Sequence, residues 1–120
     1  MQIIADFEIT GWDEQPELTY VRKRFTGAME GTSVARLLTA GDEGSGQGYL
    51  ASEEVTATID GRAGTFVLQH GGIVSGDGEI LFQFGMVVPG TATGDLAGLT
   101  GTARYEHTEA FARVTLDVEL

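Results

Sequence analysis

Residues 49–72, YLASEEVTATIDGRAGTFVLQHGG, decide the fold because they describe a complete β-hairpin. Apolar and polar residues alternate on both sides of Asp60 and Gly61, as in strands that have one buried face. An Asp-Gly pair favours a two-residue type I′ turn, because both central residues of that turn need a positive φ. A turn centred there predicts the register of the two strands and places Glu53 opposite Leu68.

One face of the predicted hairpin is apolar apart from three polar side chains. It carries Tyr49, Ala51, Glu53, Val55, Ala57, Phe66, Leu68 and His70. Glu53 and His70 are diagonal neighbours on this face, and the Cβ atoms of such pairs lie about 7–8 Å apart. If the face is interior, both groups need partners, because burying an unpaired charge is unfavourable. The pair then either holds the register as an internal ion pair or lines a cavity where it moves protons.

The same alternation continues along almost the whole chain and predicts six further strands. With the hairpin, the predicted strands are residues 3–10, 18–30, 32–40, 48–60, 62–72, 78–88, 100–108 and 110–120. No segment has a helical period over ten residues, although residues 94–101 can hold one helical or 3₁₀ turn. Eight antiparallel strands with short connections remove their free edges by closing on themselves. We therefore predict an all-β, eight-stranded antiparallel β-barrel that forms a single domain over residues 1–120.

Composition and charge narrow the classes of partner. The 120 residues include no Cys and two distant His residues, so we expect neither disulfides nor a metal site. The formal net charge of −11 disfavours nucleic acids and anionic membrane surfaces. The first residues have no basic segment followed by an apolar run, and no apolar stretch reaches membrane-spanning length. These features predict a cytoplasmic protein with no nucleic-acid or membrane partner.

Two glycine-rich blocks, residues 48–72 and 87–101, closely resemble an uncharacterised family of small bacterial proteins with an allene oxide cyclase-like, calycin-type β-barrel. The likeness extends to GWDE at residues 11–14 and to KRFTGAMEGTSVARLLTA at residues 23–40. It implies a barrel similar to that of plant allene oxide cyclase, which needs no cofactor and steers the ring closure of a lipid epoxide. Since the family has no established activity, the functional implication is an analogy of fold.

The chain departs from the family pattern in two of its predicted strands. Arg36 stands where relatives often carry an acidic residue, so the polar network is expected to differ. The segment GEILFQFGMVV, residues 78–88, is bulkier than its counterparts. If its even-numbered residues point inward, they narrow or reshape the cavity.

The leading functional prediction is a cofactor-independent isomerase or cyclase that holds a small, mostly apolar molecule in the barrel. Glu53 and His70 would transfer protons or stabilise developing charge, and Tyr105, which alternates in phase with Ala103, would help orient the substrate. The predicted substrate-binding residues are Tyr49, Phe66, Leu68, Phe82, Phe84 and Met86. The alternatives are a non-catalytic, lipocalin-like carrier of a hydrophobic ligand and a filled barrel that serves as an assembly module. Assembly into a homo-oligomer is left open.

Three other features of the sequence carry further expectations. Alternation splits the basic run Arg22, Lys23 and Arg24 between two faces, so at least one of them is expected to be buried or at a subunit interface. His107 is expected to be exposed near the last turn. The glycine-rich loop at residues 40–48 is a candidate lid over the barrel mouth.

Overall fold

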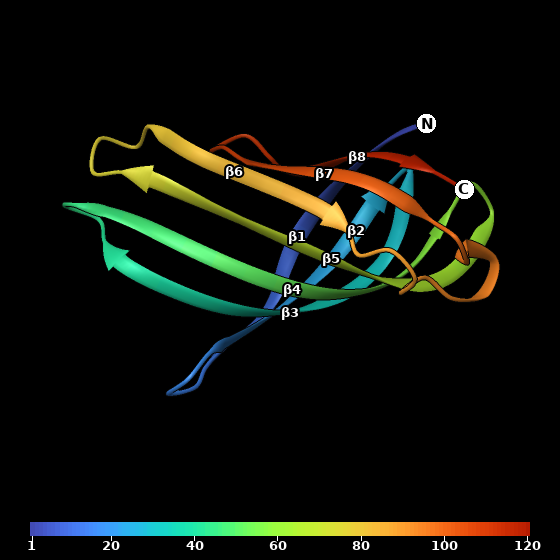
Figure 1. Cartoon of the computed structure of the whole chain (residues 1–120), viewed down its shortest axis with the longest axis horizontal. Helices are drawn as coiled ribbons and strands as arrows, with labels where there is room; N and C mark the ends of the chain where they lie inside the picture. The colour runs from blue at the N-terminus through green and yellow to red at the C-terminus, as the bar shows by residue number, and fades with distance from the viewer.

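The computed structural model describes all residues from Met1 to Leu120 and shows one closed antiparallel barrel with the strand order β1-β2-β3-β4-β5-β6-β7-β8 (Figure 1). The strands are β1 (Gln2–Glu14), β2 (Thr19–Gly27), β3 (Met29–Asp42), β4 (Gly46–Ile59), β5 (Arg62–Ser75), β6 (Ile80–Val87), β7 (Thr100–His107) and β8 (Ala112–Glu119). A single 3₁₀ turn, η1 (Gly94–Leu96), interrupts the β6–β7 connection. The predicted all-β, eight-stranded antiparallel class is therefore confirmed. No helix is long and apolar enough to cross a membrane.

The β4–β5 hairpin has the register that its sequence predicts. Glu53 pairs with Leu68 across the two strands. Asp60 and Gly61 form the turn with φ angles of 51° and 76°, as a type I′ turn requires. Both strands run for fourteen residues, so this hairpin spans the barrel from one end to the other. It sets the positions of the polar side chains that are described below.

One end of the barrel is closed by the β6–β7 loop, which folds across it beside the β4–β5 turn (Figure 1). Leu96 of η1 and Leu99 point into the barrel and join the apolar core. The loop lies directly on β5, where the Thr93 N–H donates to the Thr65 carbonyl oxygen. Gly64 makes this approach possible, because a Cβ atom there would collide with the Thr93 carbonyl oxygen. We call this packed end the closed half.

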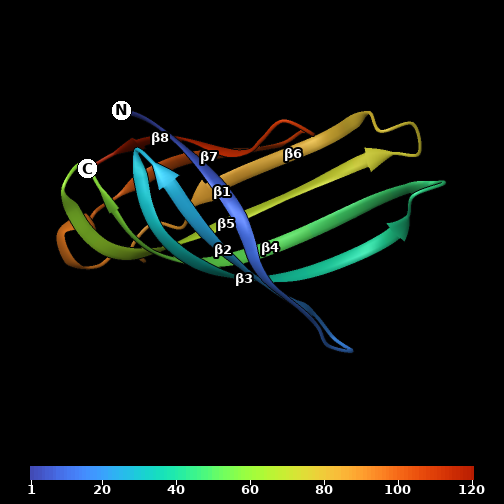
Figure 2. The ribbon, with the colours of Figure 1, turned by 180° about the vertical axis from the view of Figure 1, so that it is seen from behind.

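The opposite end flares open. The β3–β4 and β5–β6 hairpins extend in one direction, and the β1–β2 hairpin bends away from them (Figures 1 and 2). A register shift between Ile9 and Gly11 marks the bend in β1, because a β-bulge bends the strand that contains it. The interior at this end is not filled by a loop. We call it the open half.

The seam between β6 and β7 is the weakest part of the ring. Its backbone ladder contains one residue pair, Met86 with Thr102. Nearer the start of β6, the Gln83 side-chain amide donates to the Tyr105 carbonyl oxygen at 3.0 Å in place of a ladder bond. The two strands approach closely between these points, and Gly85 permits this approach, because a Cβ atom there would collide with the carbonyl group of Ala103.

The expectation that the even-numbered residues of β6 point inward is wrong for Phe84 and Met86. Gly85 and Val87 are buried, whereas Phe84 and Met86 are 38% and 51% exposed on the outer face. The cause is the register with β5, which pairs Gly85 with the inward-facing His70. The side chains of Phe84 and Met86 therefore cover the outer surface of the sheet, whereas Ile80 and Phe82, nearer the start of β6, line the interior cavity of the open end.

Candidate active site

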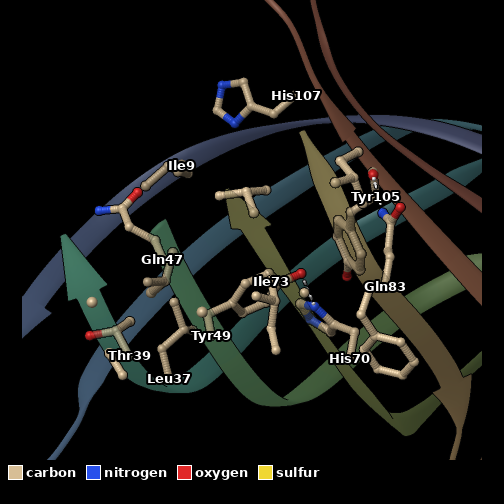
Figure 3. Close-up of a pocket in the computed structure, with 18 of the residues that line it drawn as sticks. Ile9, Leu37, Thr39, Gln47, Tyr49, His70, Ile73, Gln83, Tyr105 and His107 are labelled. Carbon is tan, nitrogen blue, oxygen red and sulfur yellow. Dashed lines mark hydrogen bonds between the residues drawn. The ribbon is translucent and has the colours of Figure 1, made fainter. Parts of the chain in front are cut away.

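A cavity of about 610 Å³ occupies the open half of the barrel. Its walls are mainly apolar and include Phe7, Ile9, Val21, Leu37 and Phe82. Its floor is polar and is formed by Lys23, Tyr49, His70 and Tyr105, whereas Trp12 and His107 lie among the lining residues that come from the strand ends. Figure 3 shows Tyr49, His70 and Tyr105 grouped together, with His107 apart from them. The chain has 18 Asp and Glu residues, and none of them lines this cavity.

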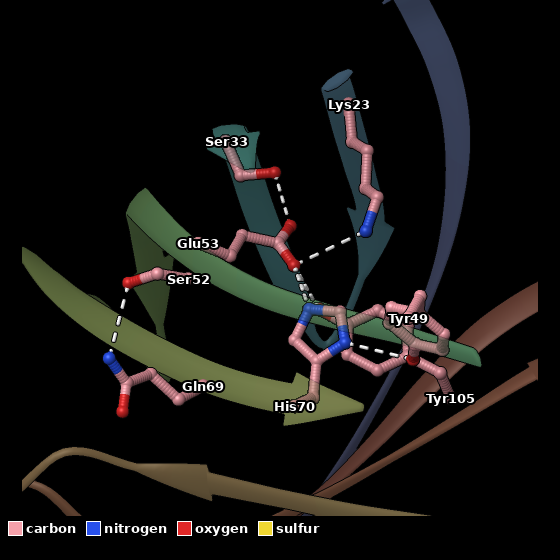
Figure 4. Close-up of polar contacts among 8 residues, drawn as sticks. All are labelled: Lys23, Ser33, Tyr49, Ser52, Glu53, Gln69, His70 and Tyr105. Atoms are coloured by element: carbon pink, nitrogen blue, oxygen red, sulfur yellow. Dashed lines mark hydrogen bonds and ion pairs between the residues drawn. The ribbon is translucent and has the colours of Figure 1, made fainter. Parts of the chain in front are cut away.

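Glu53 lies beneath the cavity floor and gathers the polar side chains of four other strands (Figure 4). Its Oε1 atom accepts hydrogen bonds from the Tyr105 hydroxyl at 2.6 Å, from His70 Nε2 at 2.7 Å and from Lys23 Nζ at 3.2 Å. Its Oε2 atom accepts one from the Ser33 hydroxyl at 2.5 Å. The residue is fully buried, so these bonds replace all contact with water.

The network holds the Glu53 carboxylate in its ionised form. Burial alone would raise the pKa of Glu53, but the hydrogen bond from His70 and the charge of Lys23 outweigh it and lower the pKa to about 2. No buried side-chain nitrogen or oxygen in the protein is left without a partner. Glu53 is therefore a satisfied buried anion, and it does not itself reach the cavity.

The orientation of the His70 ring follows from this charge. An ionised carboxylate can only accept hydrogen bonds, so His70 Nε2 must carry its proton. In the neutral ring, Nδ1 is then an acceptor, and the Tyr49 hydroxyl donates to it at 3.0 Å. Burial, followed by the charge of Glu53, raises the pKa of Tyr49, so its hydroxyl stays protonated. A hydrogen-bonded chain thus runs from the cavity through Tyr49 and His70 to Glu53.

Tyr105 fixes the other side of the imidazole. Its ring stacks on the His70 ring with centroids 4.2 Å apart and an interplanar angle of 27°. The Lys23 ammonium lies over the same Tyr105 ring, 4.5 Å from its centroid. Burial, followed by the charge of Glu53, raises the pKa of Tyr105 well above its usual value. Tyr105 therefore acts as a rigid donor that holds both the carboxylate and the imidazole in place.

The structure brings together the three predicted catalytic residues. Glu53 and His70, predicted as diagonal neighbours, are directly hydrogen-bonded, and Tyr105 bonds the same carboxylate. His70 and Tyr105 line the cavity, whereas Glu53 lies behind them. His107 is exposed, as expected, although it also lines the cavity.

The predicted substrate-binding residues divide into three groups. Tyr49 and Phe82 line the cavity. Phe66 and Leu68 do not, because they lie nearer the β4–β5 turn and are fully buried in the packed core. The prediction that Phe84 and Met86 line the cavity is wrong. Both side chains project from the outer face of β6, because of the register in which β6 pairs with β5.

Two members of the site were not assigned to it from the sequence. Lys23 belongs to the basic run that was expected to contribute a buried residue, and it lies between the inward-facing Val21 and Phe25. Its place in that alternation is the signal that could have identified it. Ser33 alternates with the buried Ala35 but carries no pattern that would separate it from an ordinary strand serine.

Arg36, the departure on β3, is exposed and takes no part in the Glu53 network. It pairs with Ser52 across the β3–β4 ladder, one position along β4 from the inward-facing Glu53. No group of three or more His, Cys, Asp or Glu side chains is placed to hold a metal ion. The polar groups that the floor of the cavity offers to a bound molecule are thus hydroxyl, imidazole and ammonium groups.

Comparison with known proteins shows which family this chain belongs to. A search of curated proteins finds no match. Among solved structures, the chain is similar to the crystal structure of a protein of unknown function from the DUF3224 family of Shewanella oneidensis MR-1, with 27% identity and a TM-score of 0.85. That match covers 98% of this chain and 95% of the other. The model of the family described as protein of unknown function (DUF3224) matches residues 3–118, so this chain belongs to that family.

Proposed function

We propose that this protein is a cofactor-independent isomerase or cyclase for a small, mostly apolar molecule held in the open half of the barrel. The observation that carries this proposal is the hydrogen-bonded chain of Tyr49, His70 and Glu53, whose outer end opens into an apolar cavity. A carboxylate that orients an imidazole, which in turn contacts a hydroxyl, is an arrangement suited to general acid–base chemistry.

The geometry suggests how each group would act. When the Tyr49 hydroxyl turns towards a bound molecule, His70 Nδ1 becomes free to accept a proton from that molecule. Glu53 stabilises the imidazolium that forms, because it already accepts the Nε2 hydrogen bond. Return of the proton to another atom completes an isomerisation or ring closure without oxidation or reduction. The cavity walls would hold the molecule in its reactive conformation.

The two alternative functions make different use of the same features. A volume of about 610 Å³ lies within the range of small-molecule sites and disfavours a filled barrel that serves only as an assembly module. A lipocalin-like carrier would use the apolar walls but would not need a proton-transfer chain beneath them. We therefore rank the carrier second.

The proposal also includes the type of barrel, the oligomeric state, the cellular location and the kind of partner. Closed antiparallel topology and a buried carboxylate support an allene oxide cyclase-like barrel. The exposed apolar side chains Phe84 and Met86 on the outer face of β6 are compatible with a homo-oligomer. A cytoplasmic location and a small apolar molecule as the partner stay predictions.

Mass-conserving turnover distinguishes the proposed enzyme from a carrier. The purified protein is incubated with an apolar extract of bacterial cells, and compounds are followed by liquid chromatography with mass spectrometry. We expect one compound to decrease while a compound of equal mass and different retention time increases. The conversion should be lost in His70→Gln, which keeps a donor for Glu53 but cannot accept and return a proton in the same way.

The matched control for this experiment is Tyr20→Phe, which removes a hydroxyl from a residue of β2 that does not line the cavity. It should convert the compound at the same rate as the unchanged protein. If the protein retains a compound from the extract and releases it unaltered, while no pair of isomers changes in amount, the protein is a carrier and the proposed enzyme function is wrong.

A further inference from the structure

The floor of the cavity offers hydrogen-bond donors and lacks a carboxylate of its own. The Lys23 side chain is 9% exposed, and its ammonium has three N–H donors but bonds one oxygen, Glu53 Oε1. Its other neighbours are the aromatic rings of Phe7, with the centroid at 5.0 Å, and Tyr105. A ring face is a weaker acceptor than an oxygen atom, so Lys23 can still serve an oxygen of a bound molecule.

The charges beneath the floor favour a neutral acceptor on the ligand. Lys23 and the ionised Glu53 already form an ion pair at 3.2 Å, so their charges cancel. A carbonyl oxygen would receive hydrogen bonds without adding charge to this buried layer. A carboxylate would add a second anion near Glu53, which a site of low polarity disfavours.

The spacing of Tyr49 and His70 also matches a carbonyl compound. The Tyr49 hydroxyl oxygen and His70 Nδ1 are 3.0 Å apart and lie at the same part of the cavity floor. A carbonyl oxygen and the hydrogen on its neighbouring carbon are likewise close together in one molecule. A donor and a base side by side can therefore act on both at once.

Resting on the proposed function, we infer that the substrate is an apolar ketone or enone whose carbonyl oxygen faces Tyr49 and Lys23, and whose adjacent carbon loses a proton to His70 Nδ1. The C–H bond breaks, its electron pair forms a C=C bond, and the carbonyl π pair moves to the oxygen. The hydroxyl and ammonium stabilise that oxygen by hydrogen bonds. Return of the proton from His70 to the far end of a conjugated enol moves the double bond and gives an isomer, whereas return to the same carbon restores the ketone; no electrons are gained or lost in either case.

Deuterium exchange tests this inference with simple probes. 2-Octanone and 2-cyclohexenone are incubated with the protein in D₂O, and the loss of the signals from hydrogens next to the carbonyl is followed by proton NMR. We expect exchange at least about ten times faster than in buffer, a barrier difference of about 1.4 kcal/mol. Tyr20→Phe should exchange at the rate of the unchanged protein.

Three variants assign the roles. His70→Gln should abolish the acceleration, whereas Tyr49→Phe and Lys23→Met should reduce it, because each removes one donor to the oxygen. Thermal unfolding measured alongside identifies any variant that fails to fold. If Lys23→Met unfolds, Lys23→Arg replaces it, and a change in the exchange rate without a change in unfolding temperature then supports the role of the ammonium.

The outcomes separate this inference from the function on which it rests. If neither ketone exchanges but a mass-conserving conversion persists in the cell extract, the carbonyl substrate is wrong and the isomerase or cyclase survives. If octanoate binds in calorimetry and the ketones neither bind nor exchange, the floor takes a carboxylate and the inference is overturned. If both exchange and conversion are absent, both proposals fall.

Discussion

The two halves of this barrel are built from the same strands by the same alternation, yet they differ in what fills the interior. In the closed half, large apolar side chains such as Phe66 and Leu96 meet and exclude water. In the open half, the interior positions of the same strands carry Tyr49 and His70 and border a cavity. The layer of Lys23, Ser33, Glu53, His70 and Tyr105 divides the two. The packed core and the cavity therefore occupy opposite ends of one sheet.

The largest effect is expected from truncation in the closed half. Phe66→Ala should lower the free energy of unfolding by about 3–5 kcal/mol, because it leaves a cavity in a fully packed core. Ile73→Ala in the open half should change it by less than about 1 kcal/mol, since Ile73 is half exposed. Urea unfolding measures both variants. Equal losses would show that the halves are not distinct in stability.

Removing the charge of the dividing layer should have the next largest effect. Glu53→Gln leaves Lys23 as a buried cation without its anion and should lower the free energy of unfolding by about 3 kcal/mol. The double variant Glu53→Gln/Lys23→Met removes both charges and should recover a large part of that loss. Denaturant titration of the two single variants and the double variant gives the coupling energy. A coupling near zero would contradict the ion pair.

Acid should act on the same layer. The pKa of Glu53 is about 2 in the folded protein and near the ordinary glutamate value when unfolded, so the unfolded state binds the proton more tightly. The resulting stability, about 3 kcal/mol, is fully present above about pH 5 and is lost as the pH falls towards 2. Unfolding measured across this range should show a steeper loss for the unchanged protein than for Glu53→Gln. Parallel curves would mean that Glu53 does not carry the effect.

Among substitutions of the polar network, the smallest effect on stability is expected on the cavity side of the layer. Tyr49→Phe removes one hydrogen bond to His70 from a partly buried site and should lower the free energy of unfolding by about 1 kcal/mol. The same variant should lose most of any turnover. Calorimetry gives the change in stability and the exchange assay gives the change in turnover, both measured on one preparation of the variant. A stability loss like that of Phe66→Ala would place Tyr49 in the structural half.

The sequence predicts the central hairpin well because its signals are local. A two-residue turn sets the register, and the register brings Glu53 and His70 together without any knowledge of the rest of the barrel. Tyr105 could be placed inward by alternation with Ala103. That it reaches the same carboxylate depends on closure of the ring, which is a non-local property.

β6 shows why the remaining details could not be predicted. Its outer face is as apolar as an interior face, so alternation of hydrophobicity does not identify the buried side. The pairing of Gly85 with His70 decides the direction, and a glycine gives no hydrophobic signal. The division of wall residues from core residues depends on where Leu96 and Leu99 enter the barrel, which the alternation of β5 does not contain.

The single ladder pair between β6 and β7 has a consequence for how this protein tolerates change. Elsewhere the strands of the ring are joined by backbone ladders, whose N–H and carbonyl groups do not depend on the side chain unless proline is introduced. Between the start of β6 and Met86, the ring is closed by a side chain, because the carboxamide of Gln83 bonds the Tyr105 carbonyl oxygen. A substitution at this one position can therefore change how closely the two strands approach, and with it the width of the cavity that Tyr105 lines.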